Sequence, residues 1–235
     1  MAIDDLPLPV VNLLNVLGVP WPYIDEDQVR SFATLTRQFA TAVRTTHEDA
    51  TRTIADLAVA YQGSATDAMS SGWAKLSGRH VDEIIDGSHV LADALDVAAG
   101  YIVAQKLEAI AVLVGMAAAF AGDQVAAVAT FGIAEVAVPA IIEGAERIVK
   151  SLVMDLEQFV AGKVIEAAAE PLFQKIEDAF AGLDWSRSGA GVEPAASVSL
   201  DAEAALAHVA KLEEHAETIR GHGTQFRTAI AGLGF

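Results

Sequence analysis

The chain of 235 residues has no cysteine, so disulfide bridges, thiolate zinc sites and cysteine nucleophiles are all excluded. Basic residues are also scarce, because 15 lysines and arginines stand against 32 aspartates and glutamates, a formal net charge of −17. Such an acidic surface repels phosphate backbones and anionic lipid headgroups. We therefore expect no binding to nucleic acid, and few residue types remain for catalysis.

The first five residues lack the basic residues that begin a secretory signal peptide, so the apolar stretch that follows is not a usual one. Residues 7–17 are instead predicted to form a short helix, which Gly18 and the Pro20-Trp21-Pro22 turn end. We expect Trp21 to be a packing anchor rather than a ligand contact. Export, if it occurs, is expected to use a route for folded proteins after synthesis in the cytoplasm.

Catalytic and metal-binding patterns are lacking as well. The six histidines are dispersed, and only His208 and His215 share a helix face, two turns apart, whereas metal ligation on one helix favours i,i+4 spacing. Glu213-Glu214 and Asp82-Glu83 are neighbours along predicted helices, which points their carboxylates apart. No glycine-rich phosphate loop or nucleophile elbow is found. We expect no enzyme, no cofactor and no metal site.

Apolar residues recur at steps of three and four in two long segments, about 27–60 and 65–97. The first stripe contains Phe32, Leu35, Phe39, Val43, Ala50, Ile54 and Leu57, and the second contains Met69, Trp73, Leu76, His80, Ile84, Leu91 and Leu95. These spacings predict two amphipathic helices that close on each other as an antiparallel hairpin. Each arm is about 50 Å long at 1.5 Å per residue, a shape that rarely forms a pocket.

Tyr61-Gln62-Gly63 lies between the two arms and is predicted to be the hairpin turn. Gly63 can adopt a positive φ angle without a Cβ penalty, and Ser64 or Thr66 can cap the next helix. We expect Tyr61 to pack across the mouth of the hairpin, where Trp73 also points.

These residues resemble the WXG-type proteins of ESX (type VII) secretion systems, and in particular the helical N-terminal domains of large actinobacterial toxins that these systems export. The resemblance covers about residues 20–97: Tyr61-Gln62-Gly63 stands in place of Trp-X-Gly, the run 64–69 leads to Trp73-Ala74-Lys75-Leu76, and Trp21-Pro22 is followed by Asp25-Glu26-Asp27. It implies a non-catalytic targeting domain, with small WXG-type chains and the secretion ATPase as partners. Tyr61, Gly63 and Trp73 would be its recognition residues.

The family carries an export signal of the form Tyr-X-X-X-Asp/Glu after its helix pair, and none is found near the C-terminus. Tyr23 and Asp27 have this spacing but precede the first arm. This pair has two interpretations. It is either the export signal or a solvated helix start, whose acidic side chains interact favourably with the helix dipole. The resemblance also implies that an effector domain, absent from this chain, would follow.

The central region is unusually apolar, since the fourteen residues from Ala109 to Gly122 carry no charge. Two interpretations compete: a helix buried in a soluble bundle, or a membrane-inserting hairpin within 102–142 that turns at Gly122-Asp123. The buried helix is favoured, because a transmembrane helix needs about 20 apolar residues.

The last hundred residues again show helical periodicity with breaks. Pro139 is predicted to begin or kink a helix that reaches Ile165, and Glu170-Pro171 to mark another break before a short helix that ends at Gly182. After a linker at 184–198, Ser199 or Asp201 caps a final amphipathic helix that must pack on the hairpin or on another chain. Its apolar stripe contains Leu200, Leu206, Val209, Leu212, Ile219 and Phe226.

The predicted fold is all-α, an elongated helical bundle built on an antiparallel WXG-like hairpin with an apolar central helical region. The predicted domains are 1–25 (short helix and Pro-Trp-Pro turn), 26–183 (helical bundle), 184–198 (linker) and 199–235 (amphipathic helix on the bundle). The function implied by the resemblance is targeting of a secreted toxin to type VII secretion. The alternatives are a membrane-inserting domain that guides an effector and a structural helical oligomer.

Overall fold

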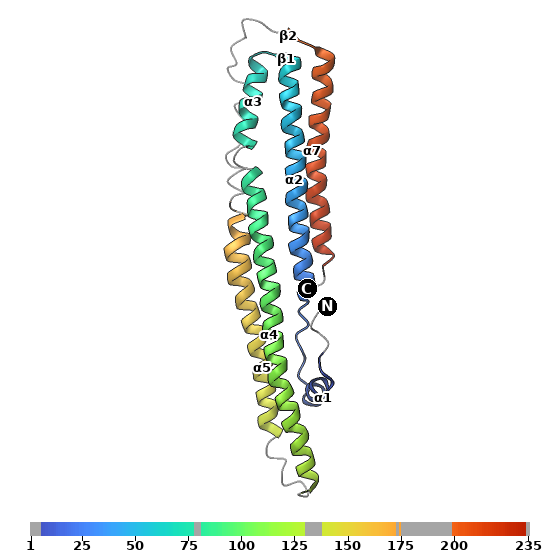
Figure 1. The fold of residues 1–235 in the computed structure, drawn as a ribbon, viewed down its shortest axis with the longest axis vertical. Helices are drawn as coiled ribbons and strands as arrows, with labels where there is room; N and C mark the ends of the chain where they lie inside the picture. The colour runs from blue at the N-terminus through green and yellow to red at the C-terminus, as the bar shows by residue number, and fades with distance from the viewer. Residues whose placement is uncertain (1–5, 78–80, 130–137, 173, 175–198, 234–235) are drawn as a thin grey trace. The chain divides into compact units, whose positions relative to one another are not determined.

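The protein is all-α, which confirms the predicted fold class. The computed structural model describes residues 6–77, 81–129, 138–172, 174 and 199–233 (Figure 1). Its helices are α1 (Leu8–Leu17), α2 (Glu26–Ala60), α3 (Ser64–Leu76), α4 (Asp82–Ala129), α5 (Val138–Phe159), the π-helical segment η3 (Val160–Ala169) and α7 (Ala202–Ala231). Two strands of two residues each, β1 (Tyr61–Gln62) and β2 (Ser199–Leu200), pair antiparallel.

Contacts divide the chain into two compact units. Unit 1 contains Met1–Ser31, Ala94–Ile165 and Gly234–Phe235, and unit 2 contains Phe32–Asp93 and Glu166–Leu233. The long helices α2 and α4 contribute to both units. The domain boundaries expected from the sequence stay a prediction, and the expected linker at 184–198 lies outside the described residues.

In unit 2, α2 runs antiparallel to the second arm of the hairpin. Ala40 and Val43 form a core cluster with Ile85, and farther along the arms Arg37 pairs with Asp93 at 2.6 Å. The second arm is not the single helix expected over 65–97, since α3 ends at Leu76 and α4 begins at Asp82.

The two arms stay nearly in register across this interruption. His47 of α2 contacts Ser77 before the junction, and beyond it Ala40 shares a core cluster with Ile85. Seven residues of α2 are therefore matched by eight residues of the second arm. The regular α-helix ends at the α3–α4 junction without a shift in the pairing of the arms.

Helix α2 has two contact faces rather than the single stripe predicted. The most buried positions toward the second arm are small residues such as Ala33, Thr36 and Ala40, while Phe32 and Phe39 are only half-buried. Both phenylalanines contact α7, where the Phe39 and Phe226 rings stack with centroids 4.7 Å apart, and Phe39 also packs against the core cluster of the two arms. Small residues allow the two arms to approach closely, and the phenylalanine rings provide the contact with α7.

Helix α7 packs antiparallel on α2 within unit 2, side by side with it in Figure 1. His215 lies 3.1 Å from the Thr53 hydroxyl and His222 lies 3.0 Å from the Thr46 hydroxyl. The predicted apolar stripe is only partly used, because Leu206, Val209 and Ile219 remain exposed. Polar His–Thr pairs and the contacts of Phe226 with two phenylalanines of α2 hold this helix, and none of its described residues is fully buried.

In unit 1, α4 runs antiparallel to α5. The rings of Tyr101 and Phe159 stack with centroids 3.9 Å apart, and farther along the pair Met116 lies over Gly144. Helix α1 ends at Gly18, whose φ of 68° is the left-handed conformation that favours glycine. Trp21 is 5% exposed, which confirms its role as a packing anchor.

The apolar part of α4 differs from both interpretations of the sequence. The helix continues through Gly122 and Asp123 to Ala129, so no turn forms there. Only one face of it is buried, because Leu113 is completely inaccessible while Val114 is 41% exposed. Its 82–123 segment contains an 18-residue window with a mean hydropathy of 1.7, and it is long and apolar enough to cross a membrane, a property that core helices share.

Helix α5 begins at Val138 with Pro139 in its first turn, a position at which a missing N–H is harmless. The predicted break at Glu170-Pro171 is displaced, because both residues are helical and the change to π-helical hydrogen bonding occurs before them, in η3. A proline has no N–H to donate to the preceding turn, so the i→i−4 pattern is interrupted at Pro171.

Candidate recognition site

The predicted turn joins α2 to α3 with an extended backbone. Gly63 has φ 178° and ψ 167°, so the expected positive φ is wrong, and any residue can adopt this conformation. Glycine is favoured for another reason: a Cβ atom would lie 3.3 Å from the ring of Tyr61. The half-buried tyrosine folds back over the glycine rather than across the mouth of the hairpin.

The N-cap residue of α3 is Gly63, not Ser64 or Thr66 as predicted, and Thr66 in the first turn bonds back to it. The Gly63 N–H donates to the Thr66 hydroxyl at 3.2 Å, and that hydroxyl lies 2.8 Å from the carbonyl oxygens of Tyr61 and Gly63. Thr66 is 4% exposed, so these polar groups satisfy one another away from water. The turn is therefore rigidly hydrogen-bonded.

A distant segment completes the turn, which the sequence analysis missed. Tyr61 pairs with Leu200 and Gln62 with Ser199, and the Asp201 N–H donates to the Ala60 carbonyl at 2.9 Å. The Asp201 side chain then accepts the Ala204 N–H at 3.1 Å and caps α7, as predicted for one of the two candidates. Runs of two residues carry no periodicity, so the pattern offered no signal for this pairing.

Trp73 lies away from the turn, contrary to expectation. Its ring stacks on His47 with centroids 5.2 Å apart, and its Nε1–H donates to the Thr51 hydroxyl at 2.9 Å. Thr51 precedes Tyr61 by ten residues of helix, about 15 Å along α2. Trp73 therefore fastens α3 to α2, and Tyr61 and Gly63 form the turn without it.

His47 is held in the same place by polar and aromatic contacts. Its Nε2 lies 3.0 Å from the Ser77 hydroxyl. Burial lowers the pKa of His47 below its usual value, although the nearby charges of Asp82 and Glu48 act in the opposite direction. The imidazole is thus favoured in its neutral form beside the indole of Trp73.

The Tyr23 and Asp27 pair lies at the start of α2 in unit 1. Tyr23 is 72% exposed, and Asp27 forms an ion pair with Arg30 at 2.9 Å. Asp25 caps the helix by accepting the N–H groups of Asp27 and Gln28 at 2.9 and 3.2 Å. An export signal at Tyr23 and Asp27 stays a prediction.

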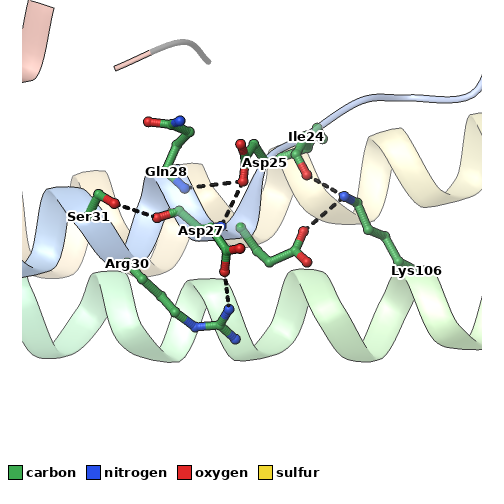
Figure 2. A network of polar contacts seen from close by, with 8 residues as sticks. Ile24, Asp25, Asp27, Gln28, Arg30, Ser31 and Lys106 are labelled. Carbon is green, nitrogen blue, oxygen red and sulfur yellow. Dashed lines mark hydrogen bonds and ion pairs between the residues drawn. The ribbon is translucent and has the colours of Figure 1, made fainter. Parts of the chain in front are cut away.

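Glu26 corrects the expectation of a solvated acidic helix start. Its side chain is completely buried and forms an ion pair with the equally buried Lys106 of α4, with Oε2 and Nζ 3.0 Å apart. Lys106 also donates to the Ile24 carbonyl, as Figure 2 shows. The pair fastens α4 to the beginning of α2 within unit 1. In the sequence, Lys106 is the only lysine of a long apolar helix, and this pattern is the one that indicates a buried ion pair.

The histidines do not assemble into a metal site in the part of the chain that the structure describes, where no group of three potential ligands occurs. His215 and His222 contact threonines of α2, and the buried Nδ1 of His208 has no hydrogen-bond partner among the described residues. His80 lies outside those residues.

A family model described as a WXG100-like domain matches residues 5–145, more than half of the chain. The match includes the hairpin, its turn and the Glu26–Lys106 pair, and it ends before β2 and α7. No curated protein and no solved structure matches the chain.

Proposed function

Because the chain belongs to the WXG100-like family, we propose that it is a non-catalytic targeting domain for an ESX (type VII) secretion system. The observation that supports this most is the hairpin turn itself, which is rigidly hydrogen-bonded and whose Tyr61-Gln62-Gly63 resembles a Trp-X-Gly turn. The proposal includes an actinobacterial toxin as the larger protein, with the effector domain beyond this chain. The destination would be the cell surface or the medium.

The mechanism is recognition of a preformed surface. Thr66 and the β1–β2 pair hold Tyr61 in one backbone conformation, so a partner meets an ordered aromatic side chain without an ordering cost. The proposed partners are small WXG-type chains and the secretion ATPase. Trp73 acts from behind this surface, by fastening α3 to α2.

The test is export of the full chain, fused to a small reporter, from an actinobacterial host with and without its ESX ATPase. The double variant Tyr61→Ala with Gly63→Ala removes the ring and its glycine contact. Gly72→Ala is the matched control, because a Cβ there meets nothing within 4 Å. We expect the wild type and Gly72→Ala to be exported only with the ATPase.

The turn variant should stay inside the cell. A thermal unfolding curve of the purified turn variant shows whether it is folded, so that loss of export reports on recognition. Export of the wild type without the ATPase, or undiminished export of a folded turn variant, would contradict the proposal.

Helix α4 favours a second candidate, insertion into a membrane, because its 82–123 segment is apolar over a sufficient length. The buried Lys106 charge opposes this, since insertion would carry it or its ion pair into hydrocarbon. Flotation with phosphatidylcholine vesicles tests the idea. Wild-type protein that floats, together with Val114→Asp protein that does not, would support insertion; protein that stays at the bottom of the gradient would rule it out.

A further inference from the structure

Helix α4 exposes an unbroken apolar seam within unit 1. Alternating steps of three and four residues connect eight exposed positions: Val97, Gly100, Ala104, Leu107, Ala111, Val114, Ala118 and Ala121. None of them is charged, and Val97, Leu107 and Val114 are 61, 52 and 41% exposed. A 3.5-residue repeat is the pattern by which one helix packs along another. The seam therefore fits a helix.

The neighbouring exposed face of the unit does not share this character. On α5, Arg147 pairs with Glu143 and Lys150 pairs with Glu146, and such i,i+4 ion pairs suit a water-facing surface. The apolar face of α4 is thus not a general property of unit 1. Contiguous apolar surface of this kind on one element marks an interaction surface.

We infer that a second copy of this chain covers the seam, with the two α4 helices antiparallel about a two-fold axis between Leu107 and Ala111. In this pairing Leu107 meets Ala111 of the second copy, Ala104 meets Val114, Gly100 meets Ala118 and Val97 meets Ala121. Larger side chains face smaller ones in three of the four layers, which keeps the helices at one separation. A parallel pairing would instead place leucine against leucine and glycine against glycine.

A hollow beside the seam supports this arrangement. Leu8, Pro9 and Val16 of α1 and Ala117, Phe120 and Ala121 of α4 line a hollow of about 280 Å³. In the antiparallel pairing Val97 of the second copy comes to Ala121, at the edge of this hollow. The exposed side chains of Leu8 and Val16 would then gain an apolar neighbour.

The estimated area that two copies would bury along the seam agrees with a weak dimer. The seam covers 25 residues, about 37 Å of helix, and the exposed arc is about 14 Å wide, which makes roughly 500 Å² on each copy. Two copies bury about 1,000 Å², the lower limit for a specific interface. We expect a dissociation constant of about 10 μM, because a small interface leaves little surplus over the cost of association.

Sedimentation of the full chain between about 1 and 200 μM tests this inference. Leu107→Glu should raise the dissociation constant at least about 30-fold, because it places two charges against the seam of the other copy. Met154→Glu is the matched control, since Met154 is an equally exposed apolar residue on α5, 56% accessible. It should leave the dimer unchanged, and circular dichroism should show both variants folded.

The absence of cysteine allows the orientation to be tested separately. A mixture of Leu107→Cys and Ala111→Cys proteins should form disulfide-linked dimers under mild oxidation, and neither protein alone should do so efficiently. Wild-type protein that remains monomeric at 200 μM would overturn the inference, as would a dimer that Leu107→Glu does not weaken. Cross-linking of Ala111→Cys alone would overturn the antiparallel orientation.

Discussion

Lys106 and Glu26 form an ion pair in which both side chains are completely buried, with Nζ and Oε2 3.0 Å apart. The two residues lie on different helices and far apart in the sequence, and the lysine also donates to the Ile24 carbonyl. Desolvation of two charges offsets most of their attraction, so the pair adds little net stability. The pair instead fixes the register of α4 against the start of α2, because only one alignment of the two helices satisfies both charges.

We predict that Glu26→Gln destabilises the protein by about 3 kcal/mol, because it leaves the Lys106 charge buried without its counter-charge. Urea unfolding followed by circular dichroism measures the change. The double variant Glu26→Met with Lys106→Met removes both charges and should lie within about 1–2 kcal/mol of the wild type. A double variant as unstable as Glu26→Gln would show that the charges themselves are needed.

The Trp73 indole should contribute through its hydrogen bond to Thr51. Thr51→Val removes that acceptor while keeping the side-chain shape, and should lower the free energy of unfolding by about 1 kcal/mol. In a Trp73→Phe background the same substitution should have a smaller effect, because the bond to the indole is already gone and only the Thr51 bond to the His47 carbonyl is lost. Equal effects of Thr51→Val in the two backgrounds would contradict the prediction. Urea unfolding of the four proteins completes the cycle.

Acidification should destabilise unit 2 through His47. Its pKa is lowered in the folded protein by burial, so the unfolded chain binds its proton first as the pH falls. The stability associated with neutral His47 is complete above the unfolded pKa of about 6.5 and is lost as the pH falls below it. Urea midpoints between pH 7.5 and 5.5 should fall less steeply for His47→Gln than for the wild type. Identical slopes would refute this.

Gly87 should be the glycine of α4 that least tolerates a side chain. A Cβ there would lie 2.6 Å from Leu172 Cδ1, so Gly87→Ala overpacks the contact by about 1–3 kcal/mol. Helix propensity acts in the opposite direction by about 1 kcal/mol. In a Leu172→Ala background the clash is absent, and Gly87→Ala should become stabilising by about 1 kcal/mol. Thermal unfolding of the four variants measures the reversal, and an unchanged sign would exclude the clash.

The long helices were predictable because their apolar residues repeat every three or four positions, as in 27–60, which became α2 over Glu26–Ala60. The junction between Leu76 and Asp82 was not, because the helical spacing of the sequence continues across it. The role of Gly63 was predicted from backbone freedom, whereas the structure shows contact with the Tyr61 ring. Such contacts depend on which rotamer the neighbours select, which periodicity does not encode.

Some features of the candidate site were likewise predictable from the sequence, and others were not. The turn at Tyr61 and Gly63 and the hydrogen bond from Gly63 to Thr66 depend on local chemistry over six residues, so the sequence alone located the turn. The pairing with Ser199 and Leu200 joins segments far apart in the chain, and only the docking of α7 on α2 brings them together. Trp73 was correctly placed on a helix, but its distance from the turn depends on the direction of its side chain.

The sequence by itself determined the all-α fold class, the helical hairpin and the absence of thiol chemistry, since composition and periodicity act within a few residues. The tertiary structure alone decided that Glu26 is buried against Lys106, that α7 closes the turn, and that one apolar face of α4 stays exposed. The physical reason is that a side chain's burial depends on which helices surround it. An amphipathic pattern predicts that the apolar face of a helix will be covered. Only the packing of the helices determines which residues cover that face and in what register.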